Sequence, residues 1–155
     1  INGNHLYDAS GLDELYNLQK LNVSNNEIDN LSYINDALEI TELYAENNEL
    51  SGDFGFVKNL TNLKVLCLSG NKKVSNKNLN SNLSNLTELT TLTLSGKKLL
   101  SLDFLNSMPN LERLEISDCE IELSDIVKIS TPDASGASTE ILKKMKSIWT
   151  PKCCL

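Results

Sequence analysis

The sequence predicts an α/β solenoid, a chain wound into stacked coils that each add one strand to a parallel sheet. Two observations support this prediction: one pattern recurs five times, and most copies carry an asparagine at the same place. The copies begin at Leu18, Ile40, Leu63, Leu89 and Leu111, so their starts lie 22, 23, 26 and 22 residues apart. Self-similarity at such a period is typical of a solenoid, because a single coil cannot bury its own apolar face.

The strand of each coil follows from the spacing of apolar residues. When the first residue of a copy is counted as position 1, positions 1, 4, 6 and 11 are apolar with rare exceptions. Leu21 and Val23, at positions 4 and 6, flank the polar Asn22, which is the alternation of a half-buried strand. We therefore expect positions 4 and 6 to face the core and positions 3, 5, 7 and 8 to face away from it.

Position 9 is an asparagine in three copies, as Asn26, Asn48 and Asn71. A side-chain amide carries two N–H donors and an acceptor, so a buried asparagine can pair backbone groups of its own turn and of the neighbouring turn. We expect these residues to form a ladder that pairs backbone groups which tight coils would otherwise bury without partners.

The return path of a coil carries apolar residues at every third position, for example Leu99, Leu102, Leu105 and Met108. A short helical or extended segment would bury this stripe. The copy that begins at Leu63 is the longest, and its insert runs from 74 to 85. Leucines at helical spacing predict a helix there, namely Leu79, Leu83 and Leu86.

These repeats resemble leucine-rich repeats of the short, 22-residue class, similar to those of phosphatase-regulatory subunits and bacterial internalins, over residues 1–127. The resemblance implies a right-handed horseshoe with a parallel sheet on its concave side, protein binding as the usual role, and no catalytic residues. Three positions depart from the pattern. Lys97 and Cys119 replace the ladder asparagine, and Ala45 is small at position 6, so its coil should be thinner or locally compensated.

The two ends of the chain differ from the repeats. The first coil is incomplete, because Ile1 falls on position 6 and Asn4 on position 9. Either earlier repeats precede this chain, or residues 1–17 form a degenerate cap over the open end. Residues 128–155 are expected to hold a loop, a helix over 139–149 and a cysteine-containing tail. That helix either caps the last coil or is a basic amphipathic segment for a membrane or partner.

Charge and cysteines limit the partners and the compartment. The net charge of −7 argues against a nucleic-acid binder, which needs a basic stripe. No apolar run is long enough to span a membrane, so membrane contact is expected only if the tail at Cys153 and Cys154 is lipidated. The four cysteines lack the spacing of a disulfide framework. This slightly favours a cytoplasmic location over a secreted or cell-surface one.

Catalytic and metal-binding constellations are not recognisable in the sequence. His5 is the single histidine, so any Cys–His or Ser–His–acid catalysis would depend on it alone, and it is expected far from Cys67. The adjacent Cys153 and Cys154 lack the gap between ligands that zinc sites use. We therefore expect no enzyme activity, no metal and no cofactor.

The sheet face that points away from the core is the candidate binding surface. Its central residue is Tyr44, because tyrosine and arginine often anchor protein interfaces. The candidate contact residues are Lys20, Asn22, Glu42, Tyr44, Glu46, Val65, Cys67, Thr91, Thr93, Arg113 and Glu115.

The sequence thus predicts a non-catalytic interaction module or scaffold that binds a protein partner on this concave face. The alternative is a regulatory subunit that holds or targets an enzyme such as a phosphatase. Because the chain is acidic and Glu42, Glu46 and Glu115 lie around Tyr44, the partner is expected to be partly basic.

Overall fold

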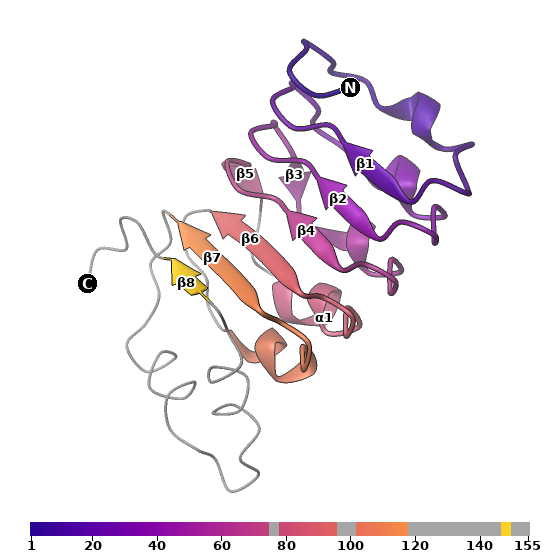
Figure 1. Ribbon diagram of the computed structural model, residues 1–155. Helices are drawn as coiled ribbons and strands as arrows, with labels where there is room; N and C mark the ends of the chain where they lie inside the picture. Colours follow the sequence, from indigo (N-terminus) through magenta and orange to yellow (C-terminus); the bar gives the residue numbers. More distant parts are fainter. Residues whose placement is uncertain (75–77, 96–101, 118–146, 150–155) are drawn as a thin grey trace, which may run out of the picture.

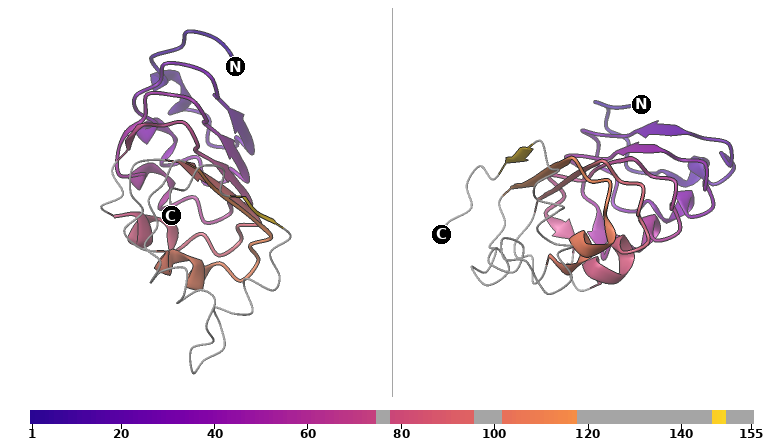
Figure 2. Two further views of the ribbon diagram at one scale, coloured as in Figure 1. Left: turned by 90° about the vertical axis from the view of Figure 1, so that its left-hand side faces the viewer. Right: turned by 60° about the horizontal axis from the view of Figure 1, so that its bottom comes forward.

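The computed structural model describes residues 1–74, 78–95, 102–117 and 147–149. Short 3₁₀ helices are labelled η. In chain order the elements are η1 (Ser10–Leu12), β1 (Lys20–Asn22), η2 (Ser32–Ile34), β2 (Glu42–Tyr44), β3 (Ser51–Gly52), η3 (Gly55–Val57), β4 (Val65–Cys67), β5 (Lys73–Val74), α1 (Leu79–Leu83), β6 (Thr91–Ser95), η4 (Asp103–Ser107), β7 (Arg113–Ser117) and β8 (Ser147–Trp149). Figures 1 and 2 show stacked coils with a sheet on one side and the short helices on the other, which confirms the predicted α/β solenoid.

The main sheet is parallel throughout, with its six strands in the order β1-β2-β4-β6-β7-β8. Its register pairs equal repeat positions, so that Leu21 lies beside Leu43 and Leu43 beside Leu66. This row of buried leucines continues through Leu92 and Leu114. A second, two-stranded parallel sheet pairs β3 with β5 where the chain turns away from the main sheet.

The asparagine ladder is confirmed at Asn26, Asn48 and Asn71, which are all buried. Asn48 donates through Nδ2 to the carbonyl oxygen of Val23 on the preceding coil at 3.0 Å, and its Oδ1 accepts from the Ile28 N–H at 3.1 Å. Asn71 makes the equivalent bond to the Ala45 carbonyl at 2.9 Å, and Asn26 reaches that of Ile1 at 3.0 Å. Each amide therefore joins two coils. Lys97 and Cys119 lie outside the described residues.

Position 8 has a role that the apolar pattern did not reveal. Gly3, Asn25, Asn47 and Gly70 occupy this position, and all four have φ between 52° and 84°. Only glycine, and to a lesser degree asparagine, adopts this left-handed conformation readily. Position 8 is thus part of the turn that leaves the sheet and does not belong to the sheet face, contrary to expectation.

The return path is buried where a coil has neighbours on both sides. Leu60, Leu86 and Met108 are completely buried at the end of their stripes. In the first coil, however, Leu15 is 42% exposed, although it belongs to the equivalent stripe of apolar residues at every third position. The reason is that this coil has a neighbour on one side only. The predicted helix in the longest repeat is confirmed as α1, which buries Leu79 and Leu83.

The predicted helix over 139–149 is wrong at its end, because Ser147–Trp149 forms β8. β8 pairs in parallel with β7 and brings Ser147 into register with Arg113 and Trp149 into register with Glu115. Without it, β7 would present an open edge of backbone N–H and C=O groups. Helical spacing is a local signal and cannot show that a distant sheet edge needs a partner strand. Strands favour β-branched and aromatic residues such as those found here. The remaining residues of that segment lie outside the described part of the chain.

Candidate protein-binding face

The concave face consists of the side chains at positions 3, 5 and 7 of the main sheet. The strand register arranges them in rows that cross the sheet. The position 3 row is Lys20, Glu42, Val65, Thr91 and Arg113. The position 5 row is Asn22, Tyr44, Cys67, Thr93 and Glu115. The structure therefore brings the predicted contact residues onto one sheet face, with neighbouring strands about 5 Å apart.

The β1–β2 end of this face is charged and internally bonded. Lys20 Nζ forms an ion pair with Glu42 Oε1 at 2.6 Å, and the Tyr44 hydroxyl donates to Glu42 Oε2 at 3.2 Å. The hydrogen bond from Lys20 lowers the pKa of Glu42, and the same bond raises the pKa of Lys20. Partial burial, followed by the charge of Glu42, raises the pKa of Tyr44. Tyr44 is thus a neutral, half-buried ring held by the carboxylate two residues before it.

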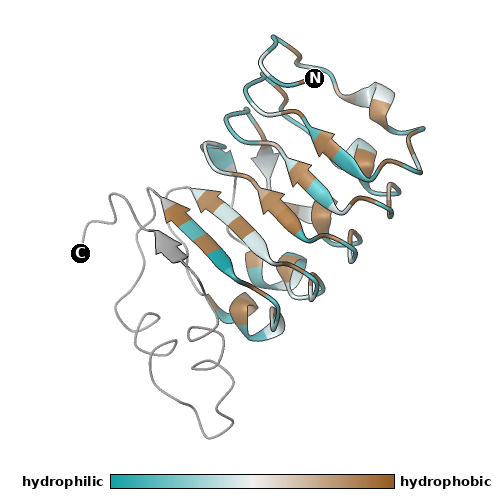
Figure 3. Ribbon diagram, viewed as in Figure 1, coloured by the Kyte–Doolittle hydropathy of each residue, from teal (hydrophilic) through white to brown (hydrophobic). Residues whose placement is uncertain are grey.

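The centre of the face, on β4 and β6, is uncharged and has small side chains. Val65 and Thr91 are half-buried. Cys67 is 7% exposed and Thr93 3% exposed. These two predicted contact residues have the expected register, but their side chains are buried at the centre of the face. Burial raises the pKa of the Cys67 thiol to about 11, and the Thr93 hydroxyl opposes that shift only in part. Hydrophobic colours dominate β4 in Figure 3, whereas β1, β2 and β7 also carry hydrophilic residues.

The β7 end carries the second charged pair, between Arg113 and Glu115. The Arg113 Nε donates to Glu115 Oε1 at 3.0 Å, and the terminal guanidinium nitrogen contacts the same oxygen. Tyr44 and Arg113, both among the predicted contact residues, are separated by β4 and β6. Glu46 is half-buried at position 7, and no Lys, Arg or His of the described residues forms an ion pair with it.

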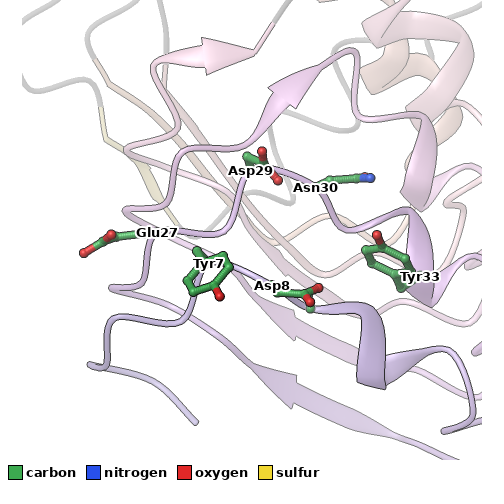
Figure 4. A pocket seen from close by; sticks show the side chains of 7 residues that line it. Tyr7, Asp8, Glu27, Asp29, Asn30 and Tyr33 are labelled. Atoms are coloured by element: carbon green, nitrogen blue, oxygen red, sulfur yellow. The ribbon is translucent and has the colours of Figure 1, made fainter.

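A second polar surface was not anticipated from the repeats. Three of the four tyrosines, Tyr7, Tyr16 and Tyr33, lie outside the sheet face and are exposed. Tyr7 and Tyr33 line a hollow of about 340 Å³ between the first two coils, on the side that carries η1 and η2 (Figure 4). The signal available in the sequence was the gathering of these tyrosines in the first 33 residues, at positions that the repeat leaves free.

Within residues 1–74, 78–95, 102–117 and 147–149, no three His, Cys, Asp or Glu side chains come together as metal ligands would. None of the helices there has the length and apolar character needed to cross a bilayer. His5 is exposed, and its Nδ1 lies 2.7 Å from Glu27 Oε1.

Comparisons with known proteins point to one fold. No protein-family model matches the chain. Receptor-like protein 8 of Arabidopsis thaliana is 46% identical over 65 residues, which cover 39% of this chain and 6% of that protein. An internalin from Listeria monocytogenes superimposes with a TM-score of 0.75 at 24% identity, over 97% of this chain and 46% of the internalin chain.

The ectodomain of the Arabidopsis receptor kinase HAESA, solved with a peptide hormone ligand, superimposes with a TM-score of 0.59 at 21% identity, over 77% of this chain and 24% of that one. The chain thus spans less than half the length of each of these proteins. The repeats, the parallel sheet and the asparagine ladder, together with these likenesses, identify the chain as a protein of the leucine-rich-repeat fold.

Proposed function

We propose that the chain is a non-catalytic interaction module that binds a protein or peptide partner on its concave face. The observation that carries the proposal is the arrangement of that face. An uncharged centre on β4 and β6 lies between two charged ends, one at Lys20 and Glu42 and the other at Arg113 and Glu115. An apolar or neutral centre with a polar rim is the usual organisation of a protein interface.

The charges of the face favour a partly basic partner. Glu42 and Glu115 are already paired with Lys20 and Arg113. Glu46 has no ion pair among the described residues and lies two residues from Tyr44. A lysine or arginine of the partner would pair with Glu46, and the net charge of −7 would accelerate its approach.

The HAESA ectodomain, which has the same fold, was solved in complex with a peptide hormone. This supports a peptide or protein ligand as the class of partner for a repeat sheet of this kind. The face of the present chain is neutral at its centre and holds one tyrosine, so we expect Tyr44 to contribute more than any other single side chain.

The test is capture of partners from an extract of the source cells, with bound proteins quantified by mass spectrometry. A true partner of the concave face is retained by the unchanged chain and by Tyr16→Ala, because Tyr16 is exposed outside this face. It is lost on Tyr44→Ala combined with Arg113→Ala. An enzyme recovered in stoichiometric amounts would mark the module as a regulatory subunit. A partner retained by the double variant would reject the concave face.

A further inference from the structure

The hollow between the first two coils is lined by two tyrosines and three carboxylates. It is bounded by Tyr7, Asp8, Ala9, Glu27, Asp29, Asn30 and Tyr33. Residues 7–9 lead into η1, residues 29–31 lead into η2, and Tyr33 lies within η2, so the hollow lies on the helix-bearing side and not on the concave face. Figure 4 shows Asp8 between the two tyrosine rings, with Asp29 and Asn30 on the adjacent coil.

The two aromatic rings are unusually open to solvent. Tyr7 is 74% exposed and Tyr33 37%, and neither occupies a position that the repeat uses for its core. Tyrosine is among the residues that most often anchor interfaces, since it offers a large rigid ring at a small cost in conformational entropy. Two such rings on one hollow of about 340 Å³ offer faces on which a flat group can stack.

The charge of the hollow has one sign. Asp8, Glu27 and Asp29 contribute carboxylates, and no lysine or arginine is part of the lining. The Ser10 N–H donates to Asp8 Oδ1 at 2.8 Å and lowers the pKa of Asp8, which keeps this carboxylate ionised at neutral pH. Glu27 contacts the exposed His5. The charge of Asp29 helps to raise the pKa of Lys73, but Lys73 pairs with Glu49 at 2.9 Å, and no cation among the described residues lies within ion-pair distance of Asp29.

We infer that this hollow binds an arginine side chain presented by a basic segment of a protein partner. A guanidinium group is planar, stacks on aromatic faces and donates paired hydrogen bonds to carboxylates. Tyr7 and Tyr33 supply the faces, and Asp8 and Asp29 the acceptors. An anionic ligand is disfavoured by the charge. A metal ion is disfavoured because the described residues hold no group of three suitable ligands. This inference does not rest on binding at the concave face.

The probe is an acetylated and amidated peptide of alternating glycine and arginine, titrated into the full chain at low ionic strength and followed by amide chemical shifts in NMR. We expect the shifts to centre on Tyr7, Asp8, Asp29 and Tyr33. The same peptide with lysine should bind more weakly, and the uncharged citrulline peptide should not bind. Tyr7→Ala combined with Tyr33→Ala should weaken binding by roughly 4- to 25-fold, since each exposed cation–π contact is worth about 2- to 5-fold and the two factors multiply.

Matched variants separate the hollow from general attraction to an acidic protein. Tyr7→Phe keeps the ring and should bind as the unchanged chain does. Tyr16→Ala and Glu39→Gln, which change exposed residues elsewhere, should leave the affinity within about 2-fold, whereas Asp29→Asn should lower it further. Equal effects of Asp29→Asn and Glu39→Gln, or unchanged affinity of the double tyrosine variant, would overturn the inference. Loss of binding on Tyr44→Ala would place the peptide on the concave face and overturn it as well.

Discussion

Gly70 and Asn47 face each other on neighbouring coils so closely that a Cβ atom on Gly70 would lie 2.2 Å from Asn47 Oδ1. Both residues occupy position 8 and have positive φ, 84° for Gly70 and 52° for Asn47. The turns that leave the sheet are therefore in close contact from one coil to the next at this position. Asn47 also donates from Nδ2 to Asn25 Oδ1 at 2.9 Å, which extends this outer row of turns.

We predict that Gly70→Ala destabilises the protein by roughly 1–3 kcal/mol, because alanine is strained at this φ and its methyl group would displace Asn47. Urea unfolding followed by circular dichroism measures the change. Gly11→Ala is the matched control, since Gly11 has no heavy atom near its Cβ position and no positive φ. It should be neutral or slightly stabilising. Equal stability of the two variants would show that the stacked turn contributes nothing.

Removal of a ladder asparagine should also destabilise the protein. Asn48→Ala removes the amide that bonds Val23, Ala45 and Ile28, and leaves buried backbone groups unpaired. The free energy of unfolding should fall by about 1–3 kcal/mol. Asn59→Ala removes an exposed asparagine and should cost less than about 0.5 kcal/mol. A thermal melt in which Asn48→Ala matches the unchanged chain would contradict the structural role of the ladder.

Thr93 differs from Asn48, because its buried hydroxyl forms few stabilising contacts. Apart from the neighbouring Cys67 thiol, whose pKa it lowers in part, its Oγ1 has no hydrogen-bond partner within the described residues. Thr93→Val, which keeps the shape and removes the hydroxyl, is therefore expected to leave stability unchanged or raise it by up to about 1 kcal/mol. Thr90→Val deletes an exposed bond to the Lys64 carbonyl and should not stabilise. Destabilisation by Thr93→Val of more than about 1 kcal/mol would mean that this hydroxyl is satisfied in solution.

Cys67 should be a slow thiol in the folded chain. Its pKa is raised to about 11 from 9.0, chiefly by burial, so the thiolate fraction at pH 8 is on the order of 100-fold smaller than in the unfolded chain. A variant with Cys119, Cys153 and Cys154 changed to serine isolates this thiol. Its reaction with a disulfide reagent should be at least about 100-fold slower in buffer than in urea. Rates that agree within a few-fold would place Cys67 at the surface.

The raised pKa of Cys67 also makes the free energy of unfolding depend on pH. Because the folded pKa of Cys67 is raised, its contribution to the free energy of unfolding is fully present below pH 9.0 and is lost as pH rises toward about 11. The difference in stability between the unchanged chain and Cys67→Ala should therefore shrink over this interval. A difference that stays constant from pH 8 to pH 11 would contradict the raised pKa.

The repeat in the sequence was sufficient to predict the sheet, its rows and the ladder, because positions 4, 6 and 9 are defined by burial within one coil and its neighbours. The helix around Leu79 was predicted for the same reason. The strand Ser147–Trp149 was missed because its partner, β7, lies 34 residues earlier in the register that pairs Leu114 with Ile148, and local spacing cannot report an open sheet edge.

The sequence predicts which side chains lie on the outer side of the strands, but not how exposed each of them is. Alternation places Cys67 and Thr93 on the outer side of the strands, yet it cannot show that their small side chains are covered by their neighbours. The pairing of Glu42 with both Lys20 and Tyr44 likewise depends on rotamers and on strand order. The hollow at Tyr7 and Tyr33 combines residues that the repeat pattern leaves unassigned, so only the stacked coils reveal it.

Binding of a partner to the concave face through Tyr44 is tested best by the dissociation constant of a captured partner for a small set of variants. Tyr44→Ala should weaken binding by about 2 kcal/mol, or roughly 30-fold, with the melting temperature nearly unchanged because the ring points away from the core. Arg113→Ala should weaken it less, and Tyr16→Ala not at all. A partner that binds Tyr44→Ala and the unchanged chain with equal affinity would show that Tyr44 does not anchor it.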